Sequence, residues 1–138
     1  MKTILVLEDD PSNMQLFCAL LWSKGFQVLE ATTGHEAIQI SNNEIGSIDL
    51  LVSDLQLPDL SGTKVALQLI KSRPDLLILF VSGTPMFDWT ASDLRNFRQL
   101  PARAVEFLEK PFHASTLETK IKDLLHNHDR MTALRSVG

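Results

Sequence analysis

The sequence predicts an α/β fold with a doubly wound, five-stranded parallel sheet in the strand order 2-1-3-4-5. Three observations lead to this fold class. Short, nearly continuous apolar segments alternate strictly with longer segments whose apolar residues recur at helical spacing. Apolar strands between amphipathic helices are typical of a parallel sheet that is covered on both faces. Right-handed crossovers leave few topologies for such a series, and this order is the simplest of them.

Each predicted strand is followed by a predicted helix, which together make a flavodoxin-like (βα)5 arrangement. The strands cover residues 3–7, 26–31, 48–53, 76–82 and 104–109. The helices cover residues 10–25, 33–42, 61–73 and 90–101, and a last helix starts near Ser115. From about Asn127 onward we expect a frayed or extended tail. The chain therefore divides into one domain over residues 1–127 and a tail or the start of a linker over residues 128–138.

Residues that favour helix ends flank these helical segments. Ser, Thr and Asp side chains can accept hydrogen bonds from the free N–H groups of a first turn, and a Glu three residues later completes a capping box. Glycine suits the end of a helix, and proline stops one. The predicted starts are Asp10 (with Pro11 in the first turn), Thr33 (with Glu36), Thr90 and Ser115 (with Glu118), and the predicted ends are Gly25, Pro74 and Pro101.

Composition and charge indicate a globular domain of the cytoplasm. The 138 residues are enough for one domain, and the apolar and charged fractions of 44% and 22% are ordinary. A net charge of −4 argues against a broad nucleic-acid interface. The longest apolar runs, such as residues 76–81, are too short to span a bilayer, and a single cysteine, Cys18, excludes an internal disulfide. We therefore expect no membrane contact and no direct nucleic-acid contact.

Carboxylates follow the first and third predicted strands, which are neighbours in this strand order. Glu8, Asp9 and Asp10 follow the first strand, and Asp54 follows the third. The winding direction switches between these strands, and ligands of such sheets bind there, at the carboxyl ends. Like charges this close are costly unless a cation neutralises them, and an all-oxygen donor set suits Mg²⁺. Asp10 is better explained as the cap of the following helix.

Polar residues also follow the fourth and fifth predicted strands. Ser82-Gly83-Thr84 places a hydroxyl before a residue without a side chain, and Lys110-Pro111 supplies an ammonium. Carboxylates, a metal ion, a hydroxyl and an ammonium in one crevice favour phosphoryl transfer, in which catalysis is mostly positioning and charge neutralisation. The nucleophile would be a carboxylate, because no other strong nucleophile lies at these strand ends.

Four segments of the chain resemble the receiver domain of two-component response regulators. They are LVLEDDPSN, DLLVSDLQLPDLSG, ILFVSGT and FLEKPF, in the order in which that family has them. The resemblance covers roughly residues 3–125, and the combination is specific although each segment alone is weak. It implies a phosphorylation-controlled signalling switch. Such a protein is a phosphoacceptor that assists its own phosphorylation and dephosphorylation, and not an enzyme acting on a separate substrate.

The resemblance implies a phosphoryl acceptor and a metal site. Asp54 would accept the phosphoryl group from a phosphohistidine of a sensor histidine kinase or a histidine phosphotransfer protein. Asp9 would bind Mg²⁺ directly and Glu8 through water. Asp54 and the backbone carbonyl of Gln56 would complete the protein ligands. The side chains of Gln56 and Thr84 would flank the site and set the lifetime of the phosphate.

The resemblance also implies residues that respond to the phosphoryl group. Ser82 would hydrogen bond to the phosphoryl oxygens, and Lys110 would pair first with the acceptor carboxylate and then with the phosphate. Pro111 would follow a cis peptide bond, which aims Lys110 inward. Phe107 takes the place of the switch aromatic, which turns inward when Ser82 moves toward the phosphate.

The chain departs from the family pattern in three places. Glu8 replaces the commoner Asp, and Phe107 lacks the hydroxyl that a Tyr would carry. The interval between Ser82 and Lys110 is longer than expected, which predicts an unusual fourth helix or a longer loop before it. We hypothesise that these extra residues form a docking surface with an exposed Phe87 or Trp89.

Two other functions stay open. A Mg²⁺-dependent phosphatase that uses an aspartyl phosphate would place a second acid two residues after its nucleophile, where this chain has Gln56. A receiver-like adaptor that works without phosphate fits less well with an intact set of site residues, although Glu8 leaves it open. Further expected partners are a downstream protein or an attached effector. A second copy of the chain could also pair through the face made by the fourth helix, fifth strand and fifth helix.

Overall fold

The computed structural model contains one parallel sheet with the strand order β2-β1-β3-β4-β5, as the sequence predicts. It describes the backbone of residues 1–137 and the side chains of residues 1–129. The strands are β1 (Thr3–Leu7), β2 (Gln27–Ala31), β3 (Leu50–Asp54), β4 (Leu77–Ser82) and β5 (Val105–Glu109).

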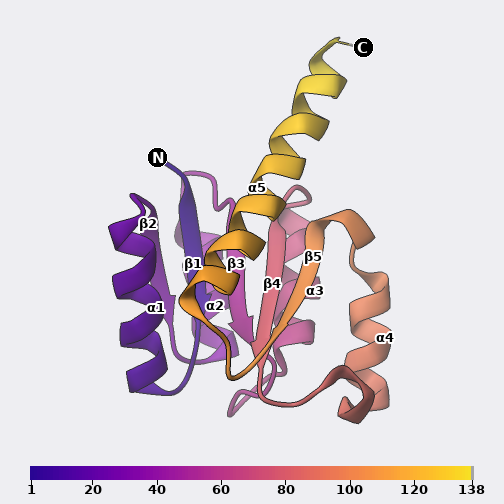
Figure 1. The fold of residues 1–138 in the computed structure, drawn as a ribbon. Helices are drawn as coiled ribbons and strands as arrows, with labels where there is room; N and C mark the ends of the chain where they lie inside the picture. The colour runs from indigo at the N-terminus through magenta and orange to yellow at the C-terminus, as the bar shows by residue number, and fades with distance from the viewer. Residues whose placement is uncertain (138) are drawn as a thin grey trace.

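Helices cover both faces of the sheet (Figure 1). One face packs against α1 (Pro11–Ser23) and α5 (Ala114–Val137), and the other packs against α2 (Gly34–Asn43), α3 (Gly62–Ser72) and α4 (Ala91–Gln99). Two short 3₁₀ helices, η1 (Met86–Asp88) and η2 (Ala102–Ala104), lie in the segments before and after α4. From β1 the chain adds β2 on one side and then β3, β4 and β5 on the other. The switch in winding direction therefore lies between β1 and β3, where the sequence predicts the site.

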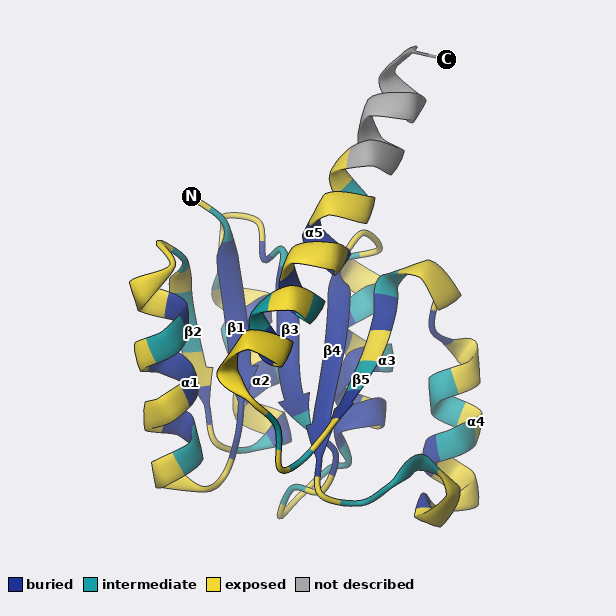
Figure 2. Cartoon of the chain, viewed as in Figure 1, coloured by how far each residue is buried: buried dark blue, intermediate teal, exposed yellow. Residues whose placement is uncertain are grey.

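The central strands lie in the most buried part of the fold (Figure 2). Every residue of β1 and β4 is buried, and β3 is buried up to its last residue, Asp54. The edge strands β2 and β5 are more exposed and contain buried, half-buried and exposed residues. Successive residues of a strand face opposite sides, so the buried side chains form one apolar core on each face of the sheet. Two of the buried polar side chains, Glu8 and Ser82, lie at the carboxyl ends of β1 and β4.

Three of the predicted helix caps are present, at Asp10, Thr33 and Thr90, and Ser61, predicted only as the start of a helical segment, is a fourth cap. The side chains of Asp10, Thr33, Ser61 and Thr90 each accept a hydrogen bond from the backbone N–H three residues later, at the starts of α1, α2, α3 and α4. Gly25, just after α1, has a positive φ of 87°, which a residue without Cβ adopts without steric cost.

The last helix differs from the sequence prediction at both ends. It begins at Ala114, near the predicted start, but Ser115 is not its cap, because Ser115 lies inside the helix and the N–H groups of Thr116 and Leu117 donate to the carbonyl of His113. The expected tail from about Asn127 is also wrong, because the backbone stays helical to Val137. There is no backbone break at residues 127–128, and the division of the chain at that point stays a prediction.

Candidate functional site

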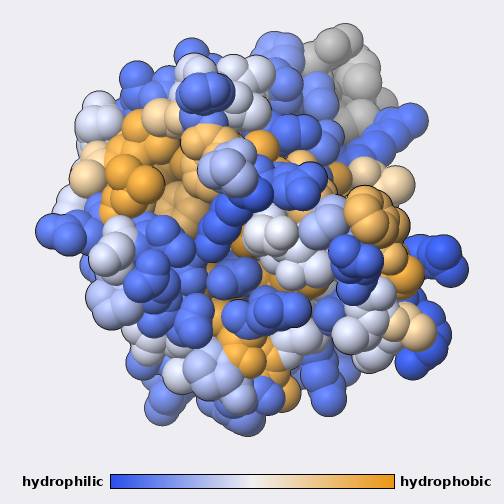
Figure 3. All heavy atoms as spheres, turned by 60° about the horizontal axis from the view of Figure 1, so that its bottom comes forward, coloured by the Kyte–Doolittle hydropathy of each residue, from blue (hydrophilic) through white to orange (hydrophobic). Residues whose placement is uncertain are grey.

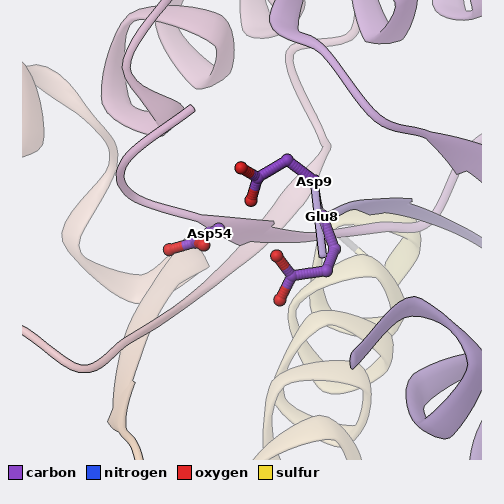
Figure 4. A group of neighbouring side chains, drawn as sticks. All are labelled: Glu8, Asp9 and Asp54. Carbon is purple, nitrogen blue, oxygen red and sulfur yellow. The ribbon is translucent and has the colours of Figure 1, made fainter. Parts of the chain in front are cut away.

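The ends of β1 and β3 bring three carboxylates together. The pairing of Leu7 with Ser53 places Glu8 and Asp9 beside Asp54. One oxygen from each of these three side chains lies within 4.8 Å of the other two. Figure 4 shows the carboxylates of Glu8, Asp9 and Asp54 around a shared space at the strand ends. Asp10 is not part of this group and caps α1, as predicted.

The three carboxylates differ in their exposure to solvent. Glu8 is buried with 2% of its surface exposed, Asp54 is half-buried, and Asp9 is exposed. Burial raises the pKa of Glu8, while the hydrogen bond and charge of Lys110 lower it in part. Glu8 also accepts a hydrogen bond from the backbone N–H of Asp10, at 3.3 Å. Glu8, the buried member of the cluster, is thus the one at which this chain has Glu in place of the commoner Asp.

Lys110 contacts two of these carboxylates. Its Nζ lies 3.0 Å from Oε1 of Glu8 and 3.9 Å from Oδ2 of Asp54. The resemblance implied that Lys110 pairs with Asp54, but its hydrogen bond goes to Glu8. The backbone N–H of Lys110 donates to the carbonyl of Ser82 at 2.8 Å, and the Lys110–Pro111 peptide bond is cis, as expected.

The Asp54 side chain is oriented by the loop that follows it. The N–H of Leu55 donates to Oδ1 of Asp54 at 2.7 Å, and the N–H of Gly62 donates to the carbonyl of Leu55 at 2.7 Å. The loop returns so close to its start that a Cβ on Gly62 would lie 2.1 Å from the Asp54 carbonyl oxygen. Only glycine fits there without a shift of the backbone. The sequence analysis quoted this glycine within a motif but assigned it no role.

The residues after β4 lie next to the carboxylate cluster. Asp54 pairs with Val81, which places Ser82 one residue further along the neighbouring strand. Ser82 is buried, and its Oγ accepts a hydrogen bond from the N–H of Thr84 at 3.1 Å. Thr84 is half-buried and Gly83 is exposed.

Gln56 lies just after β3, and Phe107 lies on β5. Gln56 is exposed, and the half-buried Phe107 pairs with Phe80 of β4. The metal contact of the Gln56 carbonyl and the switch role of Phe107 stay predictions.

The segment between β4 and α4 decides between the two aromatic residues of the docking hypothesis. Phe87 is 85% exposed, whereas Trp89 is 6% exposed and lies in the core. Of the two, only Phe87 is available to a docking surface, and the docking role stays a prediction. Figure 3 views the molecule from the side where the strands end and shows hydrophobic patches separated by hydrophilic side chains.

Asp59 makes contacts that the sequence analysis missed. Its carboxylate accepts hydrogen bonds from the N–H groups of Gly34 and His35 at the start of α2, each at 2.8 Å. It also lies 2.5 Å from Nδ1 of His35. These bonds hold the pKa of Asp59 well below its usual range, the backbone N–H of His35 contributing most. The loop after Asp54 is therefore fixed to α2, which no local sequence signal indicates.

The donor set of the cluster suits a hard divalent cation. Three carboxylates with no nitrogen or sulfur donor fit Mg²⁺ better than a softer metal. A surface hollow of about 680 Å³ lies elsewhere and is lined by residues such as Pro74, Pro101, Val105 and Leu124. No predicted site residue lines it, so the assignment of the site depends on side-chain geometry and not on a cavity.

The chain belongs to the response regulator receiver domain family, whose model matches residues 4–122. This class of protein is the phosphoacceptor module of phosphorylation-controlled two-component signalling. None of the described helices is both long and apolar enough to cross a membrane.

Curated relatives contain this domain alone or within larger proteins. The chain is 30% identical over 125 residues to the response regulator receiver protein CpdR of Brucella abortus, covering 91% of this chain and 98% of CpdR. It is 36% identical over 128 residues to the sensor kinase CckA of the same organism, covering 92% of this chain but 13% of CckA. The chain also spans only 31% of a cyclic di-GMP phosphodiesterase and 48% of the cell cycle regulator CtrA.

A solved structure has the same fold. The response regulator protein TrrA of Thermotoga maritima, in complex with Mg²⁺ and BeF, is 29% identical. It superposes with a TM-score of 0.74 and covers 91% of this chain and all of that chain.

Proposed function

We propose that this chain is a switch whose Asp54 accepts a phosphoryl group from a histidine kinase or a histidine phosphotransfer protein. The observation that carries the proposal is the position of Asp54. Its carboxylate lies at the end of the central strand β3, within 4.8 Å of the oxygens of Glu8 and Asp9 and 3.9 Å from the ammonium of Lys110. The hydrogen bond from Leu55 holds it in a fixed orientation. A carboxylate placed among charged groups in this way can act as an oriented nucleophile.

The transfer breaks one bond to the imidazole of the donor and forms one bond to the carboxylate of Asp54. The phosphorus–nitrogen bond of the phosphohistidine breaks with its electron pair going to the imidazole, and a phosphorus–oxygen bond forms to Asp54. Asp9 and Asp54 would hold Mg²⁺ directly, with the carbonyl of Gln56, and Glu8 would act through water. When bound, Mg²⁺ would neutralise charge on these carboxylates and on the transferred group.

The phosphorylated state needs new charge compensation. Phosphorylation adds roughly −1.5 to −2 charges at neutral pH to a cluster that is already acidic. The ammonium of Lys110, 3.9 Å from Asp54, and the hydroxyl of Ser82, at the end of the neighbouring strand β4, are donors that could supply this compensation. Reorienting them toward the phosphoryl oxygens would stabilise an active arrangement and so bias a pre-existing equilibrium. The same groups, with Gln56 and Thr84 at the flanks, would set how fast the chain gains and loses its phosphate.

The proposal is tested by incubating the full chain with a small phosphodonor and Mg²⁺ and measuring its mass. We expect the gain of one phosphoryl group, its absence in Asp54→Ala, and a strong reduction when a chelator removes Mg²⁺. Steady release of phosphate from an unrelated phosphate ester would instead support a phosphatase.

An adaptor that works without phosphate is the second candidate. The observation that favours it is the 3.0 Å hydrogen bond between Lys110 and Glu8, which already satisfies the ammonium in the absence of phosphate. Failure of the mass to increase, with partner binding unchanged in Asp54→Ala, would establish this function in place of the switch.

The wider setting follows from the same proposal. We propose a cytoplasmic protein that touches neither membrane nor nucleic acid directly, with residues 1–127 as the receiver and residues 128–138 as a tail or linker. Its output would pass to a downstream protein, an attached effector or a second copy bound through α4, β5 and α5. Size-exclusion chromatography with and without the phosphodonor tests the last of these.

A further inference from the structure

The long segment between β4 and α4 contains one large side chain that is buried in the core. After β4 the chain forms the 3₁₀ helix η1 and then reaches Trp89, immediately before Thr90, the cap of α4. Phe87, two residues earlier, is 85% exposed, whereas Trp89 is 6% exposed. The segment therefore has one aromatic ring in solvent and one inside the protein.

The indole of Trp89 is joined to the candidate site by two consecutive hydrogen bonds. Its Nε1–H donates to the carbonyl of Thr84 at 3.0 Å. The N–H of Thr84 donates to Oγ of Ser82 at 3.1 Å. Thr84 thus has its N–H bound to Ser82 and its carbonyl bound to Trp89. A rotation of the Ser82 side chain about χ1, which carries Oγ away from the Thr84 N–H, would remove the first of these bonds and free Thr84 to move.

The ring of Trp89 contacts the aromatic residue on β5. The centroids of Trp89 and Phe107 are 5.2 Å apart, with an interplanar angle of 86°. Trp89 also packs edge-on against Phe97 of α4, at 5.5 Å and 77°, and against Phe80 of β4, at 6.2 Å and 85°. Edge-to-face pairs have a preferred geometry, so a shift of one ring changes the packing of its neighbours. Trp89 therefore touches β4, β5 and α4 at once.

From these contacts we infer that Trp89 is a positioning residue that couples Ser82 and Thr84 to Phe107. The inference rests on the proposed function, because it needs a phosphoryl group on Asp54 to redirect the Ser82 hydroxyl. When that hydroxyl turns toward the phosphoryl oxygens, Thr84 loses its acceptor and moves. The buried indole N–H follows the Thr84 carbonyl, because a buried donor without an acceptor is costly. The displaced indole then repacks against Phe107 and α4.

The first test uses the fluorescence of Trp89 itself. The chain has two tryptophans, and the other, Trp22, is 57% exposed on α1. Trp22→Phe therefore leaves Trp89 as the only emitter. We expect its emission to shift or change in intensity when Mg²⁺ and a small phosphodonor are added, and to stay constant in the same background carrying Asp54→Ala. Phosphorylation measured by mass without an emission change would overturn the inference and leave the proposed function intact; no phosphorylation would overturn the proposed function.

The second test removes only the indole hydrogen bond. Trp89→Phe keeps an aromatic ring in the core but has no N–H for the Thr84 carbonyl. Beryllofluoride with Mg²⁺ stands in for the phosphoryl group, and the ring resonances of Phe107 report its environment by NMR. We expect Phe107 to respond in the wild type and to lose most of this response in Trp89→Phe, although the variant still gains phosphate. An unchanged Phe107 response in folded Trp89→Phe would overturn the coupling role.

The matched control is Phe87→Ala, which removes the exposed ring of the same segment. Phe87 has no ring contact and no side-chain hydrogen bond in the described part of the chain, so the emission of Trp89 and the response of Phe107 should be unchanged. Equal losses in Phe87→Ala and Trp89→Phe would mean that the whole segment matters and not the indole, which would also overturn the inference.

Discussion

The ammonium of Lys110 lies 3.0 Å from Glu8 and 3.9 Å from Asp54. Only the contact with Glu8 is a hydrogen bond. Glu8 is 2% exposed, so in the absence of metal its carboxylate depends on Lys110 for charge compensation. A metal ion would change that balance because it would compete with Lys110 for the carboxylates. A phosphoryl group would change it because it would compete with the carboxylates for the Lys110 ammonium. The contact between Glu8 and Lys110 therefore links the stability of the fold to metal binding and phosphorylation at the site.

Lys110→Met should destabilise the metal-free protein. The substitution keeps the apolar stem and removes the donor to Oε1 of Glu8, which leaves a buried carboxylate short of one partner. We expect the free energy of unfolding in urea to fall by about 1–3 kcal/mol. In a Glu8→Gln background the same substitution should cost less, because a neutral amide needs no cation. Equal losses in the two backgrounds would show that the Glu8–Lys110 pair is not the cause.

Gly62→Ala should distort the loop that orients Asp54. The added Cβ would lie 2.1 Å from the Asp54 carbonyl oxygen and 2.8 Å from Oγ of Ser53, so the backbone must shift. We expect a loss of about 1–3 kcal/mol in unfolding free energy and slower phosphorylation by a small phosphodonor. The matched variant is Gly83→Ala, where an added Cβ meets nothing within 4 Å. It should fold with nearly wild-type stability; a loss as large as that of Gly62→Ala would exclude the steric explanation.

The sheet and most helix boundaries could be predicted because their signals are local. Strand order follows from the alternation of apolar segments, and four capping side chains lie where hydrogen-bond chemistry requires them. The end of α5 could not be predicted from its polar residues. No glycine or proline occurs between Phe112 and Val137, so nothing in that stretch stops the helix.

The strand-end residues of the site could also be predicted, but their partners could not. Topology places Glu8, Asp54 and Lys110 together because the carboxyl ends of parallel strands share one edge. The choice of Lys110 between Glu8 and Asp54 depends on burial and side-chain length, which the sequence does not show. The sequence also left open which of Phe87 and Trp89 is exposed, because the inward position of Trp89 depends on the path of a loop.

Thr63 and Asp93 form a buried polar contact between α3 and α4. The hydroxyl of Thr63 donates to Oδ1 of Asp93 at 2.6 Å and accepts from Nδ2 of Asn96 at 3.1 Å. Thr63→Val keeps the shape but leaves Asp93 without this donor, and should lower the unfolding free energy by about 1–3 kcal/mol. Thr63→Ser keeps the hydroxyl and should lose only the methyl contribution, about 1 kcal/mol. Similar losses in both variants, measured by urea unfolding, would show that packing and not the hydrogen bond holds the helices together.

Asp59→Asn should change how stability depends on acid. The folded chain holds the pKa of Asp59 well below its usual value of 3.8, mainly through the backbone N–H of His35. For a carboxyl whose pKa is lowered by folding, the stabilisation is complete above the unfolded pKa and is lost as pH falls through the folded one. Asp59→Asn should therefore be less stable than the wild type at pH 6, and the difference should shrink steadily below about pH 4.

His35→Ala provides the control for this prediction. It removes the ring that lies 2.5 Å from Asp59 but keeps the backbone N–H groups of residues 34 and 35, which account for most of the shift in the Asp59 pKa. Urea unfolding at a series of pH values should therefore give His35→Ala an acid dependence close to that of the wild type. If His35→Ala instead followed Asp59→Asn, the imidazole would be the main partner of Asp59, and a side-chain pair would fix the start of α2 to the loop after Asp54.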